Sequence, residues 1–280
     1  MRNILIRIRD ILIVSLFIYI VLGIFAYTTQ DSLILIGDDE DFYGCENLPE
    51  AAVPTEHQGE RFFYANNSDD ALVILYHGNA ASGCAFDDLA YILEDAGVSY
   101  ILSVYPGFAG DEDKQSIHSM LEYTESIDSF IDIADYDMNN TMIIGYSIGG
   151  TTTSYHASRR DFRKIFLISA FNRLSETVSG FFPFYPVSLM LKEDLKNDMW
   201  LKGYDGEISV AYAEDDLTVN SRHTEHLIEN LKYYGKEPET YIINDSDHNR
   251  IMREKQLLAI LYEEAISLRN DEKLYSPFSS

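Results

Sequence analysis

Basic side chains are scarce in this sequence. Its 280 residues include 21 lysines and arginines against 46 aspartates and glutamates, and the formal net charge is −25. A nucleic acid carries charge of the same sign, so a nucleic-acid-binding protein is disfavoured. The acidic residues occur in short scattered groups rather than in a tail, and we interpret them as a solvated acidic surface.

Cysteine is also rare, and the sequence contains two, Cys45 and Cys84. No set of cysteines and histidines has the spacing of a zinc site, and His223 and His226 share a helical face without a third ligand. We therefore expect no metal and no organic cofactor. In an oxidising compartment the two cysteines would form a disulfide, and otherwise they are free thiols; both alternatives stay open.

Internal repeats and low-complexity segments are absent, and the length suits one buried domain with an appendage. Strands are expected at 33–36, 61–64, 71–76, 100–104, 141–145 and 164–169, with helices near 86–96, 115–135 and 148–159. This alternation predicts an α/β fold with a mostly parallel central sheet and helices on both faces. In such a fold, ligands bind at the carboxyl ends of the strands.

The first thirty residues form a separate unit. Arg2, Arg7 and Arg9 precede an uncharged and mostly apolar segment at 11–30. Twenty helical residues extend over about 30 Å, which is the thickness of the hydrocarbon core of a bilayer. We expect an uncleaved membrane anchor at 1–30, with a cleaved secretory signal as the alternative. The basic residues before the span predict a cytoplasmic N-terminus and an extracytoplasmic or lumenal domain.

The remainder of the chain divides by composition. We expect a stalk at 31–59, a main domain at 60–272 and a C-terminal tail at 273–280. Within the domain, residues 171–200 interrupt the alternation of strands and helices. These boundaries place one domain after the anchor.

A possible nucleophile lies at the end of an apolar, strand-like run. Residues 145–150 read Gly-Tyr-Ser-Ile-Gly-Gly, which contains the pattern G-x-S-x-G. A sharp strand-to-helix turn of this kind holds a serine clear of the backbone and needs glycines at its flanks. Ser147 would then lie at a helix N-terminus, where backbone N–H groups favour negative charge. The pattern is short, and a glycine-rich turn without chemistry is the alternative.

A nucleophilic serine needs a histidine base and an orienting carboxylate, which follow the serine in the order acid, then histidine. Of the seven histidines, His248 is the one that lies late in the chain, in a polar loop after a strand-like run. The acid is expected where Glu214, Asp215 and Asp216 follow the preceding strand. We choose Asp216 because the residues after it lead into a helix, and we keep Asp215 and Glu214 as alternatives.

An oxyanion hole requires backbone N–H donors next to the serine. The strand at 71–76 is followed by His77-Gly-Asn-Ala80, whose glycine permits a turn with exposed main chain. We expect the N–H groups of Asn79 and Ile148 to face the oxyanion. His77 is interpreted as a structural residue that fixes this loop by hydrogen bonds.

These motifs together resemble the serine hydrolases of the α/β-hydrolase superfamily. The similarity to a subgroup of single-pass, membrane-anchored hydrolases lies in His77-Gly-Asn-Ala80, Tyr105-Pro-Gly-Phe108, Gly145-Tyr-Ser-Ile-Gly-Gly150, Asp216-Leu-Thr-Val219 and Asp247-His248. The resemblance implies an α/β-hydrolase fold and substrates such as lipid esters, lysophospholipids or acylated proteins. The chain departs from the subgroup at Ala170, Ala213 and Asn220, where proline, glycine and proline are usual.

In this fold, the position of residues 171–200 commonly holds a short cap over the active site. The segment is rich in aromatic residues, and we expect an acyl chain to bind against Phe181, Phe182, Phe184 and Tyr185. Two alternatives stay open for these rings. They pack against the domain, or they form a membrane-facing patch.

The sequence thus predicts a membrane-anchored serine hydrolase. It would cleave carboxylic ester or thioester bonds of small-molecule or lipid acyl substrates through an acyl-enzyme. A serine peptidase or an acyltransferase would use the same residues. A non-catalytic, membrane-tethered binding domain is an alternative of another class, because a fold alone does not establish activity.

Overall fold

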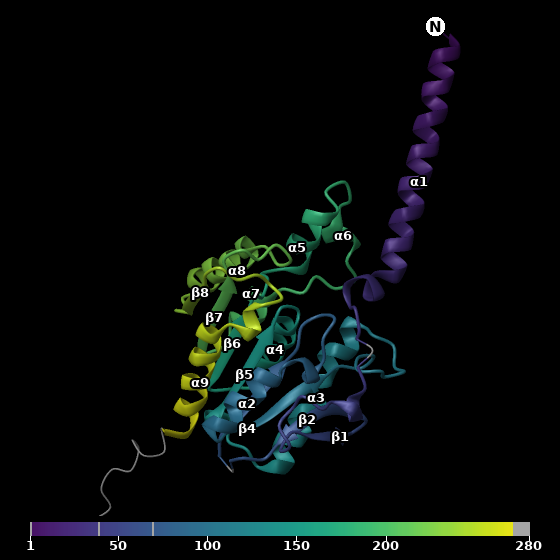
Figure 1. Cartoon of the computed structure of the whole chain (residues 1–280). Helices are drawn as coiled ribbons and strands as arrows, with labels where there is room; N and C mark the ends of the chain where they lie inside the picture. Colours follow the sequence, from purple (N-terminus) through teal and green to yellow (C-terminus); the bar gives the residue numbers. More distant parts are fainter. Residues whose placement is uncertain (1, 39, 69, 271–280) are drawn as a thin grey trace, which may run out of the picture.

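The computed structural model describes residues 2–38, 40–68 and 70–270. Its centre is one eight-stranded sheet with the strand order β1-β2-β4-β3-β5-β6-β7-β8 (Figure 1). β2 runs antiparallel to both neighbours, and the other pairs are parallel. The strands are β1 (Val53–His57), β2 (Glu60–Ala65), β3 (Leu72–Tyr76), β4 (Ser99–Val104), β5 (Thr141–Tyr146), β6 (Lys164–Ile168), β7 (Glu207–Ala213) and β8 (Glu239–Ile243). The mostly parallel sheet is therefore confirmed.

Helices cover both faces of this sheet, as the alternation predicts (Figure 1). On one face lie α2 (Asp87–Ala96) and α9 (Lys255–Asn270), and on the other lie α3 (Ile117–Ala134), α4 (Gly149–Ala157), α7 (Asn197–Leu201) and α8 (Ser221–Tyr233). Short 3-10 turns lie at Phe42–Gly44, Gly83–Ala85, Met138–Asn140 and Ile251–Arg253. Because both faces are covered, the central strands carry apolar residues at successive positions rather than alternating ones.

The pairing of β3 with β5 determines where the loops after them lie. The two strands are fully buried, and their register pairs Leu72 with Thr141 and Tyr76 with Gly145. Parallel strands in this register end at the same level of the sheet. The loop that begins at His77 and the turn that holds Ser147 are consequently neighbours.

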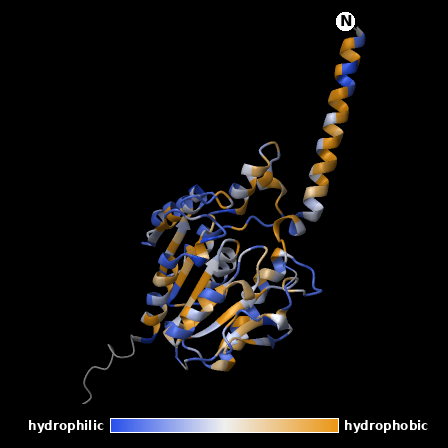
Figure 2. Ribbon diagram, in the orientation of Figure 1, coloured by the Kyte–Doolittle hydropathy of each residue, from blue (hydrophilic) through white to orange (hydrophobic). Residues whose placement is uncertain are grey.

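The N-terminal residues form one long helix, α1 (Arg2–Ile34), which projects away from the domain (Figure 1). It is apolar along most of its length, and side chains such as Phe17 and Phe25 are exposed (Figure 2). The segment 3–34 is long and apolar enough to cross a membrane. A signal sequence has the same length and composition.

The segment after the expected anchor differs from the prediction in two respects. The strand expected at 33–36 is wrong, because α1 continues through Ile34. β1 lies inside the segment 31–59 that we expected to be a stalk, and it forms the edge of the sheet. It pairs with β2 through a hairpin whose two turn residues, Gln58 and Gly59, both have positive φ, as a tight hairpin requires. The expected tail at 273–280 lies outside the described residues.

We call residues 35–38 and 40–45 the strap, because they connect the end of α1 with the region after β3. Leu35 and Phe42 place their side chains in the hydrophobic core. A disulfide between Cys45 and Cys84 joins the end of the strap to the turn that follows the β3 loop. Of the two alternatives for the cysteines, the structure therefore has the disulfide.

Residues 171–200, the cap, leave the sheet after β6 and return before β7. They form α5 (Leu174–Phe181), α6 (Val187–Met190) and α7. Where the two ends of the cap meet, Arg173 and Lys196 form an isolated β-bridge, and the N–H of Asn197 donates to the carbonyl of Asn172 at 3.0 Å. The two ends of the cap are thus hydrogen-bonded to each other.

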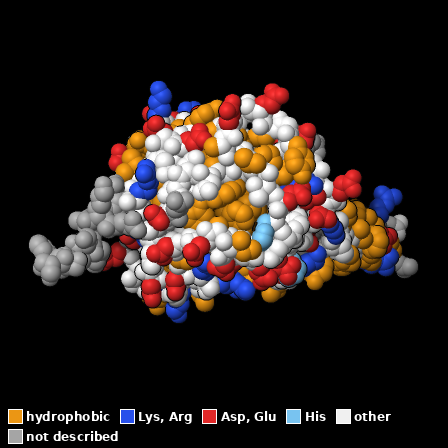
Figure 3. Space-filling view, turned by 90° about the horizontal axis from the view of Figure 1, so that it is seen from below, with side chains coloured by type: hydrophobic (Ala, Val, Ile, Leu, Met, Phe, Trp, Pro, Cys, Tyr) orange, Lys and Arg blue, Asp and Glu red, His pale blue; other side chains and the backbone are white. Residues whose placement is uncertain are grey.

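One face of the molecule shows how acidic side chains are arranged. On the face opposite α1, aspartates and glutamates surround smaller apolar areas without gathering into one patch (Figure 3). This distribution agrees with the interpretation of the net charge as a solvated acidic surface.

Candidate active site

Ser147 occupies a strained turn between β5 and α4. Its φ is +55°, a left-handed conformation that non-glycine residues rarely adopt. A Cβ on Gly149 would lie 2.1 Å from the carbonyl oxygen of Tyr76, and a Cβ on Gly145 would lie 2.6 Å from the Cα of Gly150. The glycines at both flanks are therefore required by the close approach of main chain, as the sequence predicts.

His248 lies in the loop after β8 and contacts both other residues of the expected triad. Its Nε2 is 3.0 Å from Oγ of Ser147, and its Nδ1 is 2.7 Å from Oδ2 of Asp216. A carboxylate only accepts hydrogen bonds, so Nδ1 carries the proton that is donated to Asp216. Nε2 is left to accept the hydroxyl proton of Ser147, which is the arrangement a general base needs.

Of the three consecutive carboxylates, Asp216 is the one that contacts His248. It is buried, whereas Glu214 and Asp215 are exposed. Its second oxygen, Oδ1, accepts the N–H groups of Thr218 and Val219 at 3.0 and 2.9 Å. These bonds fix the orientation of the carboxylate, and they stabilise its charge within the protein.

The loop after β3 approaches the Ser147 turn at the residue before Asn79, since a Cβ on Gly78 would lie 3.3 Å from the Cβ of Ser147. Within the described residues, the backbone N–H groups of Asn79 and Ile148 donate no hydrogen bond. The side-chain amide of Asn79 is occupied: it accepts the N–H of Ile36 and donates to the carbonyl of Ile34, each at 2.6 Å. The strap is thereby bonded to the loop that carries one of the two backbone donors.

The sequence matches one known family of hydrolases. The model of the family described as serine aminopeptidase, S33, covers residues 67–230, which is more than half of the chain. The chain belongs to this family. The matched segment includes Ser147 and Asp216, and His248 lies after it. No curated protein matches the sequence.

Solved structures of other hydrolases share the fold of this hydrolase. Carboxyl esterase 2 from the fungus Tuber melanosporum is 11% identical, with a TM-score of 0.62 over 84% of this chain and 90% of that one. An esterase from Pyrococcus furiosus is 13% identical, with a TM-score of 0.61 over 78% and 90%. A sugar hydrolase from Lactococcus lactis is 13% identical, with a TM-score of 0.61 over 79% and 98%. The expected α/β-hydrolase fold is thus confirmed.

His77 fixes the β3 loop of the hydrolase, as we expected. Its Nδ1 donates to the carbonyl of Gly78 at 2.7 Å, and its Nε2 accepts the N–H of Tyr105 at 3.2 Å. Complete burial lowers the pKa of His77 to about 4, so the ring is neutral at physiological pH. A neutral ring can both donate and accept, which is what these two backbone contacts require.

Tyr146 is a residue of the site that the sequence reasoning missed. Its hydroxyl donates to the backbone carbonyl of His248 at 2.6 Å, and the two rings lie 5.2 Å apart. Burial raises the pKa of Tyr146, so its hydroxyl keeps the proton that it donates. The residue occupies a variable position of the G-x-S-x-G pattern, and nothing local in the sequence indicates this long-range contact.

The four aromatic residues expected to bind an acyl chain lie away from this contact network. Phe181, Phe182 and Phe184 are exposed, and none of them has a described hydrogen bond or ring contact with the triad. Tyr185 stacks on Tyr19 of α1, with the ring centroids 4.4 Å apart. The structure thus brings together Ser147, Asp216 and His248, and it places Tyr185 of the cap against α1.

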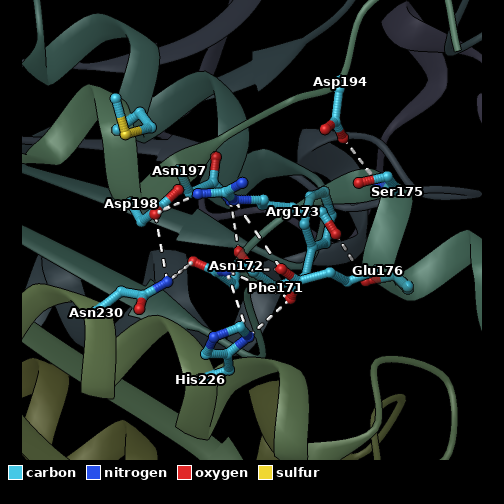
Figure 4. Close-up of polar contacts among 12 residues, drawn as sticks. Phe171, Asn172, Arg173, Ser175, Glu176, Asp194, Asn197, Asp198, His226 and Asn230 are labelled. Atoms are coloured by element: carbon cyan, nitrogen blue, oxygen red, sulfur yellow. Dashed lines mark hydrogen bonds and ion pairs between the residues drawn. The ribbon is translucent and has the colours of Figure 1, made fainter. Parts of the chain in front are cut away.

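A cluster of polar side chains joins the two ends of the cap to each other and to α8 (Figure 4). Asp198 is fully buried, and its Oδ2 accepts hydrogen bonds from Arg173 at 3.1 Å and Asn230 at 3.3 Å. His226 donates to Glu176 at 2.9 Å from the neighbouring helix. Buried charges are tolerated when they are paired, and these pairs hold the base of the cap in place. In the described part of the chain, no group of three metal-ligating side chains is assembled.

Proposed function

We propose that this protein is a membrane-anchored serine hydrolase of carboxylic esters or thioesters, with Ser147 as nucleophile, His248 as base and Asp216 as orienting acid. The observation that carries the proposal is the continuous hydrogen-bonded series from Oγ of Ser147 through His248 to Asp216. Such a series on a strand-to-helix turn is the arrangement that acyl transfer requires.

In the proposed reaction, Oγ of Ser147 attacks the acyl carbonyl while Nε2 of His248 takes its proton. Asp216 stabilises the imidazolium that forms. The backbone N–H groups of Asn79 and Ile148, which have no partner among the described residues, stabilise the oxyanion. The imidazolium then protonates the leaving group. Water activated by the neutral His248 releases the acid from the acyl-enzyme.

A lipid or small-molecule acyl ester or thioester is the proposed substrate class. A serine aminopeptidase is the second candidate, because the matching family carries that description. Parallel assays with p-nitrophenyl esters, acyl thioesters and aminoacyl p-nitroanilides distinguish the two. Preferential turnover of the anilides would favour the aminopeptidase.

We also propose that α1 is retained as a single membrane span. Arg2, Arg7 and Arg9 precede its uncharged part, which favours a cytoplasmic N-terminus and a hydrolase domain outside the cytoplasm or in a lumen. The disulfide between Cys45 and Cys84 supports an oxidising compartment. An N-terminal epitope tag tests this part: loss of the tag from the mature protein would indicate a cleaved signal instead.

A fluorophosphonate probe tests the chemistry most directly, because it reacts covalently with an activated serine. We expect the full chain to be labelled and Ser147→Ala to lose labelling and ester hydrolysis together. Ser158→Ala serves as the matched control, since this serine lies at the exposed end of α4. An unlabelled parent protein would support a binding domain, and labelling of Ser147→Ala would place the nucleophile elsewhere.

A further inference from the structure

The tip of the cap is an exposed apolar surface in a chain that is otherwise strongly charged. We define the cap tip as residues 181–190; it lies within an uncharged segment at 177–191. Outside α1, the exposed phenylalanines of the described residues are Phe181, Phe182 and Phe184, with 65%, 52% and 85% of their surface accessible. Leu189 adds a further side chain that is 83% exposed. Contiguous apolar exposure of this kind marks an interaction surface.

Contacts with α1 determine where this surface lies. The ring of Tyr185 stacks on Tyr19 and approaches Gly23, where a Cβ would lie 3.3 Å from the ring. The hydroxyl of Tyr19 donates to the carbonyl of Phe184 at 2.8 Å, and the hydroxyl of Tyr185 donates to the carbonyl of Tyr19 at 3.1 Å. The cap tip is therefore attached to the apolar part of α1.

A second, polar set of contacts joins Lys192, which lies two residues after the cap tip, to the end of α1. The N–H of Lys192 donates to Oε1 of Gln30 at 2.8 Å, and the Lys192 ammonium pairs with Asp31 at 3.5 Å. Eleven residues separate Tyr19 from Gln30, which is about 17 Å along a helix axis. The apolar contacts thus lie well inside the uncharged stretch of α1, and the charged contacts lie where it ends (Figure 2).

Several backbone N–H groups of the cap tip are bonded locally or absent. The N–H groups of Phe182, Tyr185 and Leu189 donate to nearby backbone carbonyls, and Pro183 and Pro186 have no N–H. Both tyrosine hydroxyls at the α1 contact are also satisfied. Since an unpaired polar group is costly in hydrocarbon, these local bonds lower the cost of transfer into lipid.

We propose that the cap tip inserts the side chains of Phe181, Phe182, Phe184 and Leu189 into the same bilayer that α1 spans. The occupant of this surface is the lipid bilayer, because the surface is uncharged and is held against the membrane helix. The proposal rests on the anchored hydrolase proposed above. Insertion would keep the cap, and the carboxyl edge of the sheet beneath it, facing the membrane, so that acyl substrates enter from lipid.

Tryptophan fluorescence in proteoliposomes tests the insertion. The single tryptophan is first removed by Trp200→Phe, which keeps an aromatic ring against Tyr155. Phe184→Trp is then introduced into the full chain in phosphatidylcholine vesicles with brominated acyl chains. We expect its fluorescence to be strongly quenched, and high salt to leave the quenching unchanged because the cap tip carries no charge. Leu189→Trp repeats the test in case Phe184→Trp does not fold.

Two further tryptophan variants serve as controls for the quenching experiment. Ile133→Trp reports an exposed position at the end of α3, at the opposite edge of the sheet, and should not be quenched. Phe17→Trp reports α1 itself. Quenching of Phe17→Trp without quenching of Phe184→Trp or Leu189→Trp would overturn the cap insertion and leave the anchor standing. If Phe17→Trp is unquenched, the anchor and the insertion both fail, whereas fluorophosphonate labelling still tests the hydrolase.

Activity on two substrates tests the consequence for catalysis. The combined variant Phe181→Ser, Phe182→Ser and Phe184→Ser should lower kcat/KM for an ester embedded in vesicles about tenfold, equivalent to about 1.4 kcal/mol. Turnover of a water-soluble short-chain ester should be unchanged. Equal losses on both substrates, or no loss on the vesicle ester, would overturn entry from lipid.

Discussion

Two buried histidines of this protein each join a hydroxyl group to a carboxylate, in two different regions. His248 lies between Ser147 and Asp216 at the carboxyl edge of the sheet. His156 lies between Tyr76, at 2.7 Å from its Nδ1, and Asp128, at 2.8 Å from its Nε2. Both series therefore contain a hydroxyl group, an imidazole ring and a carboxylate in the same order.

The surroundings of the two series differ. Ser147 is 7% exposed and lies beside two backbone N–H groups with no described partner, whereas Tyr76 and His156 are 0% exposed. Burial raises the pKa of Tyr76 well above its usual value, so its phenol keeps its proton. The same three kinds of group are thus in contact in two settings, and the function proposed above requires the accessible one. Access for a substrate and donors for an oxyanion must lie at the same place.

Exchanging each histidine for glutamine is the strongest test of the difference. His248→Gln should lower kcat for a soluble ester by about 10⁴-fold, because the proton of Ser147 has no acceptor of suitable basicity. His156→Gln should retain most of the parent kcat. Steady-state kinetics of the folded fractions measures both, and a comparable loss in the two variants would contradict the distinction.

For stability we expect the opposite order, so that replacing His156 costs more than replacing His248. His156→Ala leaves Asp128 and the fully buried Tyr76 hydroxyl without their shared partner, so we expect the free energy of unfolding to fall by about 3 kcal/mol. Burial alone would raise the pKa of Asp128, but hydrogen bonds and charge from His156 and Arg160 hold it below its usual value. His248→Ala should cost less, because its site is partly accessible. Urea denaturation in detergent compares the variants, and a larger loss for His248→Ala would reverse the assignment.

His77 is a third buried histidine, and it differs from the other two because its described hydrogen bonds are to backbone groups rather than to a carboxylate. Burial lowers the pKa of His77 to about 4, below the unfolded value of 6.5. The unfolded chain therefore binds more protons between pH 6.5 and 4, and stability falls as the pH falls through this window. The stability advantage of the parent over His77→Gln should shrink by about 2 kcal/mol from pH 8 to pH 5. Unfolding curves at both pH values measure it; a constant difference would mean that His77 is not held neutral.

The smallest expected effect concerns the donors that distinguish the two series. The Asn79 side chain bonds Ile34 at the end of α1 and Ile36 in the strap, so Asn79→Ala should loosen the loop while leaving its backbone N–H in the chain. We expect kcat to fall about tenfold with little change in KM, since the bond to the oxyanion strengthens in the transition state. The kcat for a soluble ester and the affinity for a trifluoromethyl ketone should fall together. A change in KM alone would indicate a contact with bound substrate instead.

Much of the site could be predicted from local sequence because its geometry is encoded by near neighbours. The glycines around Ser147 follow from steric exclusion within a single turn, and the apolar runs at 71–76 and 141–145 follow from burial on both faces of the sheet. The contact between Tyr146 and the His248 carbonyl was missed, since it joins residues 102 positions apart.

By itself, the sequence determined the alternation of strands and helices, the apolar α1 and the serine turn, because each depends on side chains a few residues apart. Only the tertiary structure decided which of three adjacent acids meets His248, that Cys45 pairs with Cys84, and that Tyr185 of the cap stacks on Tyr19 of α1. These outcomes depend on how elements distant in the chain pack together. Local propensity carries no information about that packing, because the partners of each side chain are set by the whole fold.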